Sequence, residues 1–223
     1  MFSRLELLIG DGVSKLQDGK VIVFGVGGVG GYAVEMLARS GVGHIALVDY
    51  DTVSVSNKNR QIIATDSTIG EIKVEVMKDR ILGYYPQCEV VAINDKLTVD
   101  NIAKFNIASY DFVVDAIDMV SSKVELIRFC HENNVPIISA LGAGNRIGVP
   151  NVKIVDIKQT HDDGLAKVLR KKLRELNISS HKVVFCENTT VKTGSEIIGS
   201  MATFPAVCGC MMASYVIEEL LRR

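Results

Sequence analysis

The feature that most constrains the fold is a glycine-rich segment at residues 25–30, which reads Gly-Val-Gly-Gly-Val-Gly. It follows a short β-branched run at residues 21–24 and opens a helix-length stretch. In such a strand–turn–helix unit the first glycine permits the tight turn. The second lets backbone N–H groups approach a phosphate, and the third allows close packing of helix on strand. Gly25, Gly27, Gly28 and Gly30 are therefore predicted to form a phosphate-binding loop.

Short β-branched runs alternate with longer amphipathic stretches through the first two thirds of the chain. The runs, predicted as strands, are residues 21–24, 45–48, 90–93, 112–114 and 137–138. The helical candidates between them are residues 29–39, 72–84, 99–104 and 121–133. Strands separated by helix-length segments indicate βαβ units. The sequence therefore predicts an α/β fold with a Rossmann-like, doubly wound and mostly parallel sheet.

The character of the chain changes after Pro150. The expected elements are strands at 152–157 and 183–185, helices at 163–176 and 206–221, and a polar loop at 188–200. These segments are too short to form a core of their own. We therefore expect one nucleotide-binding domain over residues 1–223, with a core at about 18–150 and a smaller C-terminal extension at about 151–223.

Composition excludes several classes of protein. The net charge of −1 gives no global basic field, and the five cysteines include no C-x-x-C pair that would indicate a zinc site. No apolar run approaches the roughly 18 residues of a membrane span, and the N-terminus does not resemble a signal peptide. We expect a cytoplasmic protein without a membrane partner.

Polar and charged residues follow the predicted strands, at the edge where open α/β sheets bind ligands. Asp49 ends the second strand, where a carboxylate can accept hydrogen bonds from ribose hydroxyls. The others are Asp51, Asn57, Arg60, Gln61, Lys73 and Asp118. Cations for phosphate oxygens and carboxylates for Mg²⁺ suit a nucleoside triphosphate, whereas hydride transfer needs neither. The glycine loop alone would equally fit an NAD-binding redox protein, which remains an alternative.

At these residues the chain resembles the superfamily of ubiquitin-activating-type adenylyltransferases. The matching segments are residues 25–30, 49–51, 56–57, 60–61, Lys73 and 115–118. The resemblance implies that ATP and Mg²⁺ are bound, with Gly27 and Gly28 at the phosphates, Asp49 at the ribose and Asp118 at the metal. It places Asp51, Asn57, Arg60 and Lys73 around the triphosphate and the reacting carboxylate. Arg4 resembles an arginine that reaches the ATP site of a neighbouring subunit, which implies a homodimer.

The second half resembles the tRNA threonylcarbamoyladenosine dehydratase branch of this superfamily. The matching segments are residues 141–145, 155–160, 165–174 and 199–200. This branch implies ATP-dependent cyclisation of threonylcarbamoyladenosine in the tRNA anticodon loop through an acyl-adenylate. The alternative within the superfamily is activation of the C-terminus of a ubiquitin-like sulfur carrier, and the missing zinc motifs argue against it. A sulfur-relay protein stays open as a further partner.

Two segments and one cysteine can each be interpreted in two ways. The basic stretch 167–174 could contact tRNA phosphates or form a solvated helix face. Residues 207–221 could belong to a subunit contact or to the core. Cys186 lies near the region where related enzymes carry a transfer cysteine, but a small buried thiol is the better expectation.

Overall fold

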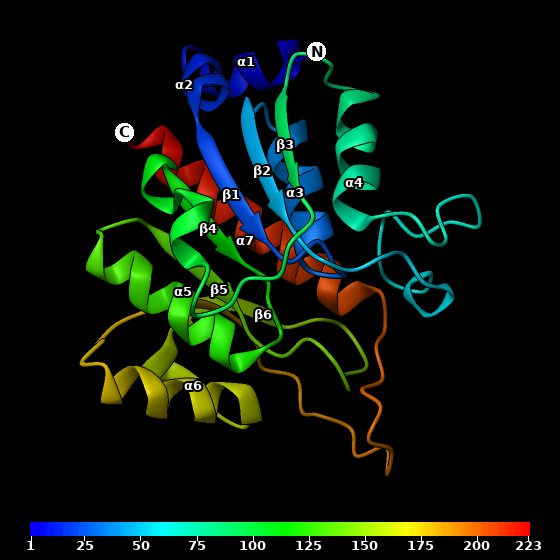
Figure 1. The fold of residues 1–223 in the computed structure, drawn as a ribbon, viewed down its shortest axis with the longest axis vertical. Coiled ribbons are helices and arrows are strands. Elements are labelled where there is room, and N and C mark those ends of the chain that lie inside the picture. The colour runs from blue at the N-terminus through cyan, green and yellow to red at the C-terminus, as the bar shows by residue number, and fades with distance from the viewer.

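The computed structural model covers residues 1–223 and contains one seven-stranded sheet with helices on both faces (Figure 1). The strands are β1 (Lys20–Phe24), β2 (His44–Val48), β3 (Glu89–Ile93), β4 (Phe112–Asp115), β5 (Ile137–Ala140), β6 (Val152–Asp156) and β7 (Lys182–Cys186). Their order is β3-β2-β1-β4-β5-β7-β6, and only β6 runs antiparallel to its neighbour. The predicted doubly wound, mostly parallel sheet is confirmed.

Two helical layers cover the sheet because the strand side chains alternate between two apolar faces. Val21 and Val23 of β1 join one core, and Ile22 and Phe24 join the other. The first core is closed by α3 (Gly30–Arg39), α4 (Lys73–Leu82) and α7 (Thr203–Leu221). The second core is closed by α5 (Val120–Glu132) and α6 (Gly164–Glu175).

The register of the central strands positions the site. Phe24 at the end of β1 pairs with Val48 at the end of β2 and with Asp115 at the end of β4. The segments that follow these residues therefore emerge side by side. The chain also reverses its direction of progress across the sheet between β1 and β4, where doubly wound sheets bind ligands.

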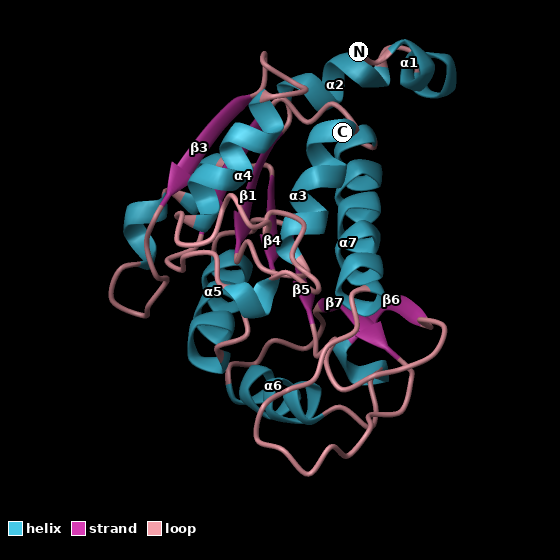
Figure 2. Cartoon of the chain, turned by 90° about the vertical axis from the view of Figure 1, so that its right-hand side faces the viewer, coloured by secondary structure: helices cyan, strands magenta, loops and turns pink.

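The C-terminal segment extends the same sheet. Strands β6 and β7 add to the edge beyond β5, and α7 returns across the first face to lie beside α3 (Figure 2). Gly209 permits this approach, since a Cβ atom there would lie 2.3 Å from the carbonyl oxygen of Val29. The stretch 207–221 thus contributes to the core through its inner side, including Cys208, Met212 and Val216.

Three local expectations need correction. The predicted helix at 99–104 is a single 3-10 turn, η2 (Ile102–Phe105). The Asn101 side chain binds the backbone of Thr98 and Lys96, and a left-handed Asn106 ends the turn. Two helices were not expected, α1 (Ser3–Ile9) and α2 (Gly12–Asp18), which have no side-chain caps and bury at most one residue each.

The third correction concerns the expectation that no apolar stretch is long enough to span a membrane. Helix α7 has 19 residues, most of them apolar, so by length and composition alone it could span a membrane. This helix lies against α3 and β7, and its most deeply buried residues belong to the first core. Core helices of globular domains can be equally long and apolar.

Candidate functional site

A cleft of about 630 Å³ lies at the carboxyl ends of β1, β2, β4 and β5. It is lined by the glycine loop, by the segments that follow β2, β4 and β5, and by part of the segment before α7. The predicted site residues that line it are Gly25, Gly27, Gly28, Asp49, Asp51, Asn57, Arg60, Gln61, Lys73 and Asp118. Gly30 and Arg4 do not line it.

The glycine loop owes its shape to two very close backbone contacts. Gly25 has φ +88°, and a Cβ atom there would lie 2.7 Å from the carbonyl oxygen of Ala116. A Cβ atom on Gly30 would lie 1.8 Å from the carbonyl oxygen of Gly25. Gly27 is different, because the nearest atom to its Cβ position is Nε2 of Gln61 at 3.8 Å. Gly25 and Gly30 therefore shape the turn, and Gly27 leaves open space over it.

Asp49 ties the glycine loop to the end of β2. Its Oδ2 accepts a hydrogen bond of 2.6 Å from the backbone N–H of Val26, and its Oδ1 accepts one of 2.9 Å from that of Asp51. The carboxylate thus fixes two loops that meet in the cleft.

Lys73 and Asp51 form an ion pair in the cleft wall. Lys73 Nζ lies 2.8 Å from Asp51 Oδ2, and Lys73 is the first residue of α4. The backbone N–H of Lys73 also donates to the carbonyl oxygen of Asp51, so the two segments are joined twice. An almost fully buried lysine is thereby held in the wall of the cleft.

The turn η1 (Val55–Asn57) brings three further polar side chains to the cleft. Asn57 Oδ1 accepts from the backbone N–H of Ser54 and so closes this turn. Arg60 Nη1 donates to the carbonyl oxygen of Ser56, which steadies the guanidinium. Gln61 is 7% exposed, and its Oε1 is the one buried side-chain polar atom without a hydrogen-bond partner. Such an atom is costly unless a ligand satisfies it.

Three carboxylates, Asp49, Asp51 and Asp118, line the cleft around Tyr50. Asp118 is exposed in the cleft, in the segment after β4. Partial desolvation first, and then the charges of Asp51, Asp118 and Asp49, raise the pKa of the Tyr50 phenol. Lys96 lies 5.0 Å from the Tyr50 ring centre and also lines the cleft. Tyr50 lies inside the matched segment 49–51 but was given no role from the sequence, and Lys96 was not expected at all.

The loop that carries Asp118 is supported by a fully buried ion pair. Lys123 Nζ of α5 lies 2.7 Å from Asp115 Oδ2, and both side chains are 0% exposed. Asp115 Oδ1 also accepts from the backbone N–H of Ile117. The segment 115–118 was predicted from the sequence, but Lys123 was not. The only sequence signal for Lys123 is its position on the inward side of an amphipathic helix.

The end of the polar segment 188–200 reaches the cleft. Its Gly199 donates to Asn145 Oδ1 at 2.6 Å and accepts from the Asn145 backbone N–H at 2.7 Å. Ile198 and Ser200 line the cleft. A second buried ion pair joins Arg146, in the loop after β5, to Asp163 at the start of α6, with a distance of 3.1 Å. Neither the Asn145–Gly199 contact nor the Arg146–Asp163 pair was predicted, because each joins residues far apart in the chain.

Arg4 and Cys186 lie outside the cleft. Arg4 is exposed on α1, which packs on α2 rather than among the cleft residues. Its expected role in a neighbouring subunit stays a prediction. Cys186 is 2% exposed, with its Sγ 3.4 Å from that of Cys208, so it is a buried thiol as expected.

The chain is similar to known proteins over its whole length. The profile of the ThiF family matches residues 3–223. The tRNA threonylcarbamoyladenosine dehydratase of Bacillus subtilis is 39% identical, over 99% of this chain and 94% of the relative. The Escherichia coli enzyme of that name, solved with AMP, is 33% identical with a TM-score of 0.94 over 99% of this chain and 94% of that chain. With ATP its TM-score is 0.93.

A relative with another substrate matches over a shorter stretch. The molybdopterin-synthase adenylyltransferase of Salmonella typhimurium is 39% identical, but over 58% of this chain and 51% of its own length. The similarity to the dehydratases extends through the C-terminal segment.

Proposed function

We propose that this chain, which belongs to the ThiF family, is an ATP-dependent enzyme that dehydrates threonylcarbamoyladenosine in tRNA. The observation that carries the proposal is the full-length similarity to dehydratases of this activity, in a chain whose cleft combines a phosphate loop with Lys73, Arg60 and Asp118. The same comparisons favour this function over activation of a sulfur carrier and over an NAD-dependent redox reaction.

The cleft residues fit ATP. Backbone N–H groups around Gly27 and Gly28 and the start of α3 suit the phosphates, because unpaired donors and the helix dipole attract anions. The Gln61 side chain lies beside this loop, and its unpartnered Oε1 would gain a donor when a nucleotide or its hydration shell is bound. Asp49, which already holds two backbone N–H groups, is proposed to meet the ribose with its remaining acceptor capacity.

The reaction follows from carboxylate activation. A carboxylate oxygen of the threonylcarbamoyl group attacks the α-phosphorus of ATP, and the bond from that phosphorus to the bridging oxygen breaks to release pyrophosphate. A nucleophile within the same modification then attacks the acyl carbon and loses its proton. The acyl carbon–oxygen bond breaks, and AMP leaves with one oxygen of the former carboxylate. The net change in the nucleoside is the loss of water.

The chain supplies position and charge rather than a covalent nucleophile. Lys73 and Arg60 would neutralise charge that develops on phosphate, and the Asp51–Lys73 and Arg60–Ser56 contacts hold both cations in place beforehand. Asn57 would keep the η1 turn in the geometry that presents Arg60.

Asp118 is the residue proposed to hold Mg²⁺. The chain has no group of three or more acidic, histidine or cysteine side chains that could bind a metal by themselves. One exposed carboxylate in a phosphate-binding cleft fits Mg²⁺, which is commonly bound by one or two carboxylates together with substrate phosphates. When bound, the ion would supply electrostatic stabilisation of the phosphates.

The proposed partners are tRNA, a second copy of the chain and, as a further candidate, a sulfur-relay protein. Leu7 and Leu8 on α1 are 86% and 82% exposed, beside Arg4 on the same helix. Burial of these leucines between two subunits would support the homodimer and bring Arg4 to a neighbouring cleft. A tRNA-modifying enzyme of this kind is expected in the cytoplasm.

The product tests the proposal. We expect tRNA that carries threonylcarbamoyladenosine, incubated with the protein, ATP and Mg²⁺, to yield on digestion a nucleoside lighter by one water. An unchanged nucleoside mass under conditions where ATP is bound would overturn the assignment to this activity.

A further inference from the structure

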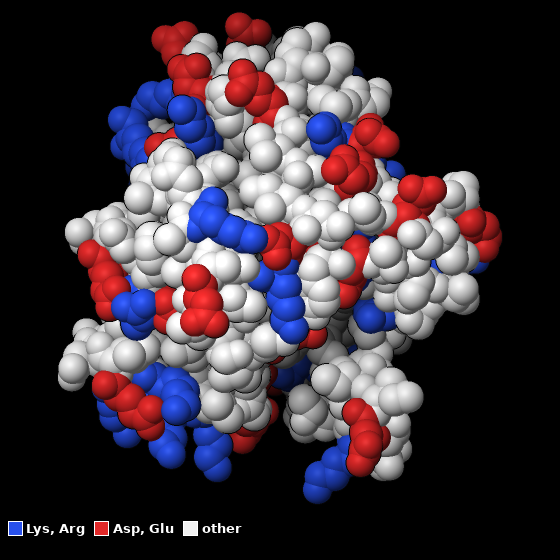
Figure 3. Space-filling view, in the orientation of Figure 1, with Lys and Arg blue, Asp and Glu red and all other residues white.

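Helix α6 carries a stripe of cations along its outer side. Lys167, Arg170, Lys171 and Arg174 stand at positions i, i+3, i+4 and i+7, which share one side of an α-helix. The inner side is formed by the buried Ala166, Leu169 and Leu173. Figure 3 shows Lys and Arg side chains gathered at the lower left, where α6 lies in Figure 1.

The charges of this stripe are not neutralised. None of its four cations forms an ion pair, whereas Lys172, at about 140° around the helix axis from Lys167, pairs with Glu175 at 3.2 Å. Like charges three or four residues apart on a helix repel one another. The unneutralised stripe is therefore able to attract an anionic partner.

The stripe leads into a groove of about 320 Å³ between α6 and the turn η4 (Ile157–Gln159). The side chains that matter are Ile157, Leu173 and Ile178, which form an apolar floor, and Lys158, Arg170 and Arg174, which supply charge. Arg170 Nη1 donates to the carbonyl oxygen of Thr160 at 2.7 Å, so its guanidinium is fixed in advance. The volume is at the small end of ligand sites.

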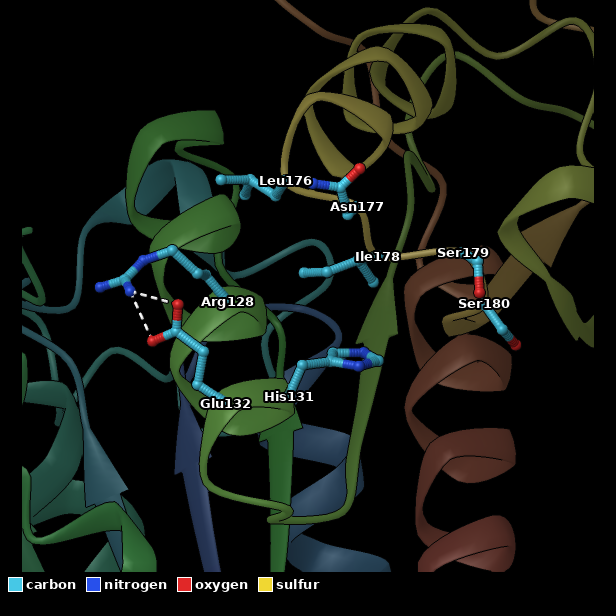
Figure 4. Close-up of a pocket in the computed structure, with 8 residues that line it drawn as sticks. All are labelled: Arg128, His131, Glu132, Leu176, Asn177, Ile178, Ser179 and Ser180. Carbon is cyan, nitrogen blue, oxygen red and sulfur yellow. Dashed lines mark hydrogen bonds and ion pairs between the residues drawn. The ribbon is translucent and has the colours of Figure 1, made fainter.

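A neighbouring pocket differs from this groove because its arginine is already paired. It shares residues 177–179 with the groove and is also lined by Arg128, His131 and Glu132 (Figure 4). Arg128 there pairs with Glu125 and with Glu132, both at 2.5 Å. Its cation is already neutralised, and we assign it no ligand.

The groove is connected to the cleft by α6 itself. Leu165, in the first turn, lines the cleft, and Arg174 lies nine residues further along. At 1.5 Å per residue this separation is roughly 14 Å along the helix axis. A few nucleotides of a single strand can span that distance.

We propose that the stripe and the η4–α6 groove are an RNA-binding site that receives an unstacked nucleotide of the tRNA, a few positions from the nucleotide in the cleft. The inference rests on the proposed function. Cations of the stripe contact the RNA backbone, the apolar floor packs against a base, and Lys158 and Arg174 bind the phosphate beside that base. Basic grooves that follow the nucleic-acid backbone, and apolar side chains that pack against an unstacked base, are both used by proteins to hold nucleotides outside a helix.

The test measures equilibrium binding of tRNA to the full chain at about 50 to 200 mM salt. We expect Lys158→Gln/Arg174→Gln to weaken binding roughly tenfold and to reduce the salt slope by about 1 for each cation removed. Ile178→Ala should weaken binding severalfold without a change of slope. Lys172→Gln, on the same helix but off the stripe, is the matched control and should bind like the unaltered protein.

The variants should also raise KM for tRNA while kcat at saturating tRNA is kept, because the cleft is untouched. Unaltered affinity and salt slope in Lys158→Gln/Arg174→Gln would overturn the site, and unaltered affinity in Ile178→Ala would overturn the insertion of a base. Failure of the proposed function has a different signature, since the unaltered protein would then leave the nucleoside mass of the modified tRNA unchanged.

Discussion

The ammonium group of Lys73 lies 2.8 Å from Oδ2 of Asp51, and the lysine side chain is 6% exposed while that of the aspartate is 47% exposed. The buried partner is thus the cation, and the solvated partner is the carboxylate. If Lys73 is removed, Asp51 can be hydrated, so the fold should tolerate the change.

Lys73→Ala should lower turnover roughly 100-fold or more, because a fixed cation at the phosphates is lost. Thermal unfolding should change little. The control is Lys78→Ala in the same helix, at a residue that does not line the cleft. Arg60→Ala should resemble Lys73→Ala. Full turnover in both cleft variants would contradict the roles proposed for these residues.

The glycine loop allows binding and folding to be separated. Gly27→Val adds bulk where open space faces the cleft, so it should weaken ATP binding with little change in Tm. Gly30→Ala places a Cβ against the carbonyl of Gly25, so it should lower Tm. Calorimetry of ATP binding and thermal unfolding check the pair. Equal effects of both substitutions on both measurements would argue against this division.

The Asp115–Lys123 pair should dominate stability beneath the site. Lys123→Met leaves a buried carboxylate without its cation and should lower the free energy of unfolding by about 3–5 kcal/mol. Urea unfolding measures this change. The double variant Asp115→Asn/Lys123→Met should lose less, since no buried charge is left unpaired. A double variant less stable than Lys123→Met would contradict the electrostatic explanation.

His181 should make stability depend on pH. Burial, then the nearby His131 and Lys123, lower its pKa from 6.5 to about 3, and Asp156 opposes this shift. Since the folded pKa is below the unfolded value, the stabilisation is present above about pH 6.5 and is lost as the pH falls toward 3. The slope is about 1.4 kcal/mol per pH unit. In urea unfolding, His181→Gln should have a shallower slope, and exposed His161→Gln should match the unaltered protein. Equal slopes in all three would refute the assignment.

Most of the fold was predictable because periodicity is a local signal. All seven strands lie where β-branched runs predicted them, and the glycine loop located the end of β1 correctly. Elements that bury little, such as α1, leave no periodic signature and were missed. The turn at 102–105 was mistaken for a helix because side-chain bonds of Asn101 override its pattern.

The cleft residues were predictable as a set because parallel strands end at one edge. The residues that support the cleft were not predictable. Lys123 and the Asn145–Gly199 tether act through contacts between distant segments, which spacing along one sequence does not encode. The groove at η4 was also invisible, although the basic stretch that forms part of its rim was noted.

The most direct test of the central claim follows the carboxylate oxygen of the modified nucleoside into the phosphate products. Threonylcarbamoyladenosine tRNA labelled with ¹⁸O in its carboxylate is incubated with the protein, ATP and Mg²⁺, and the phosphate products are analysed by mass. The account predicts one labelled oxygen in AMP, together with release of unlabelled pyrophosphate. Label in inorganic phosphate with formation of ADP, or AMP without label, would contradict activation through an acyl-adenylate.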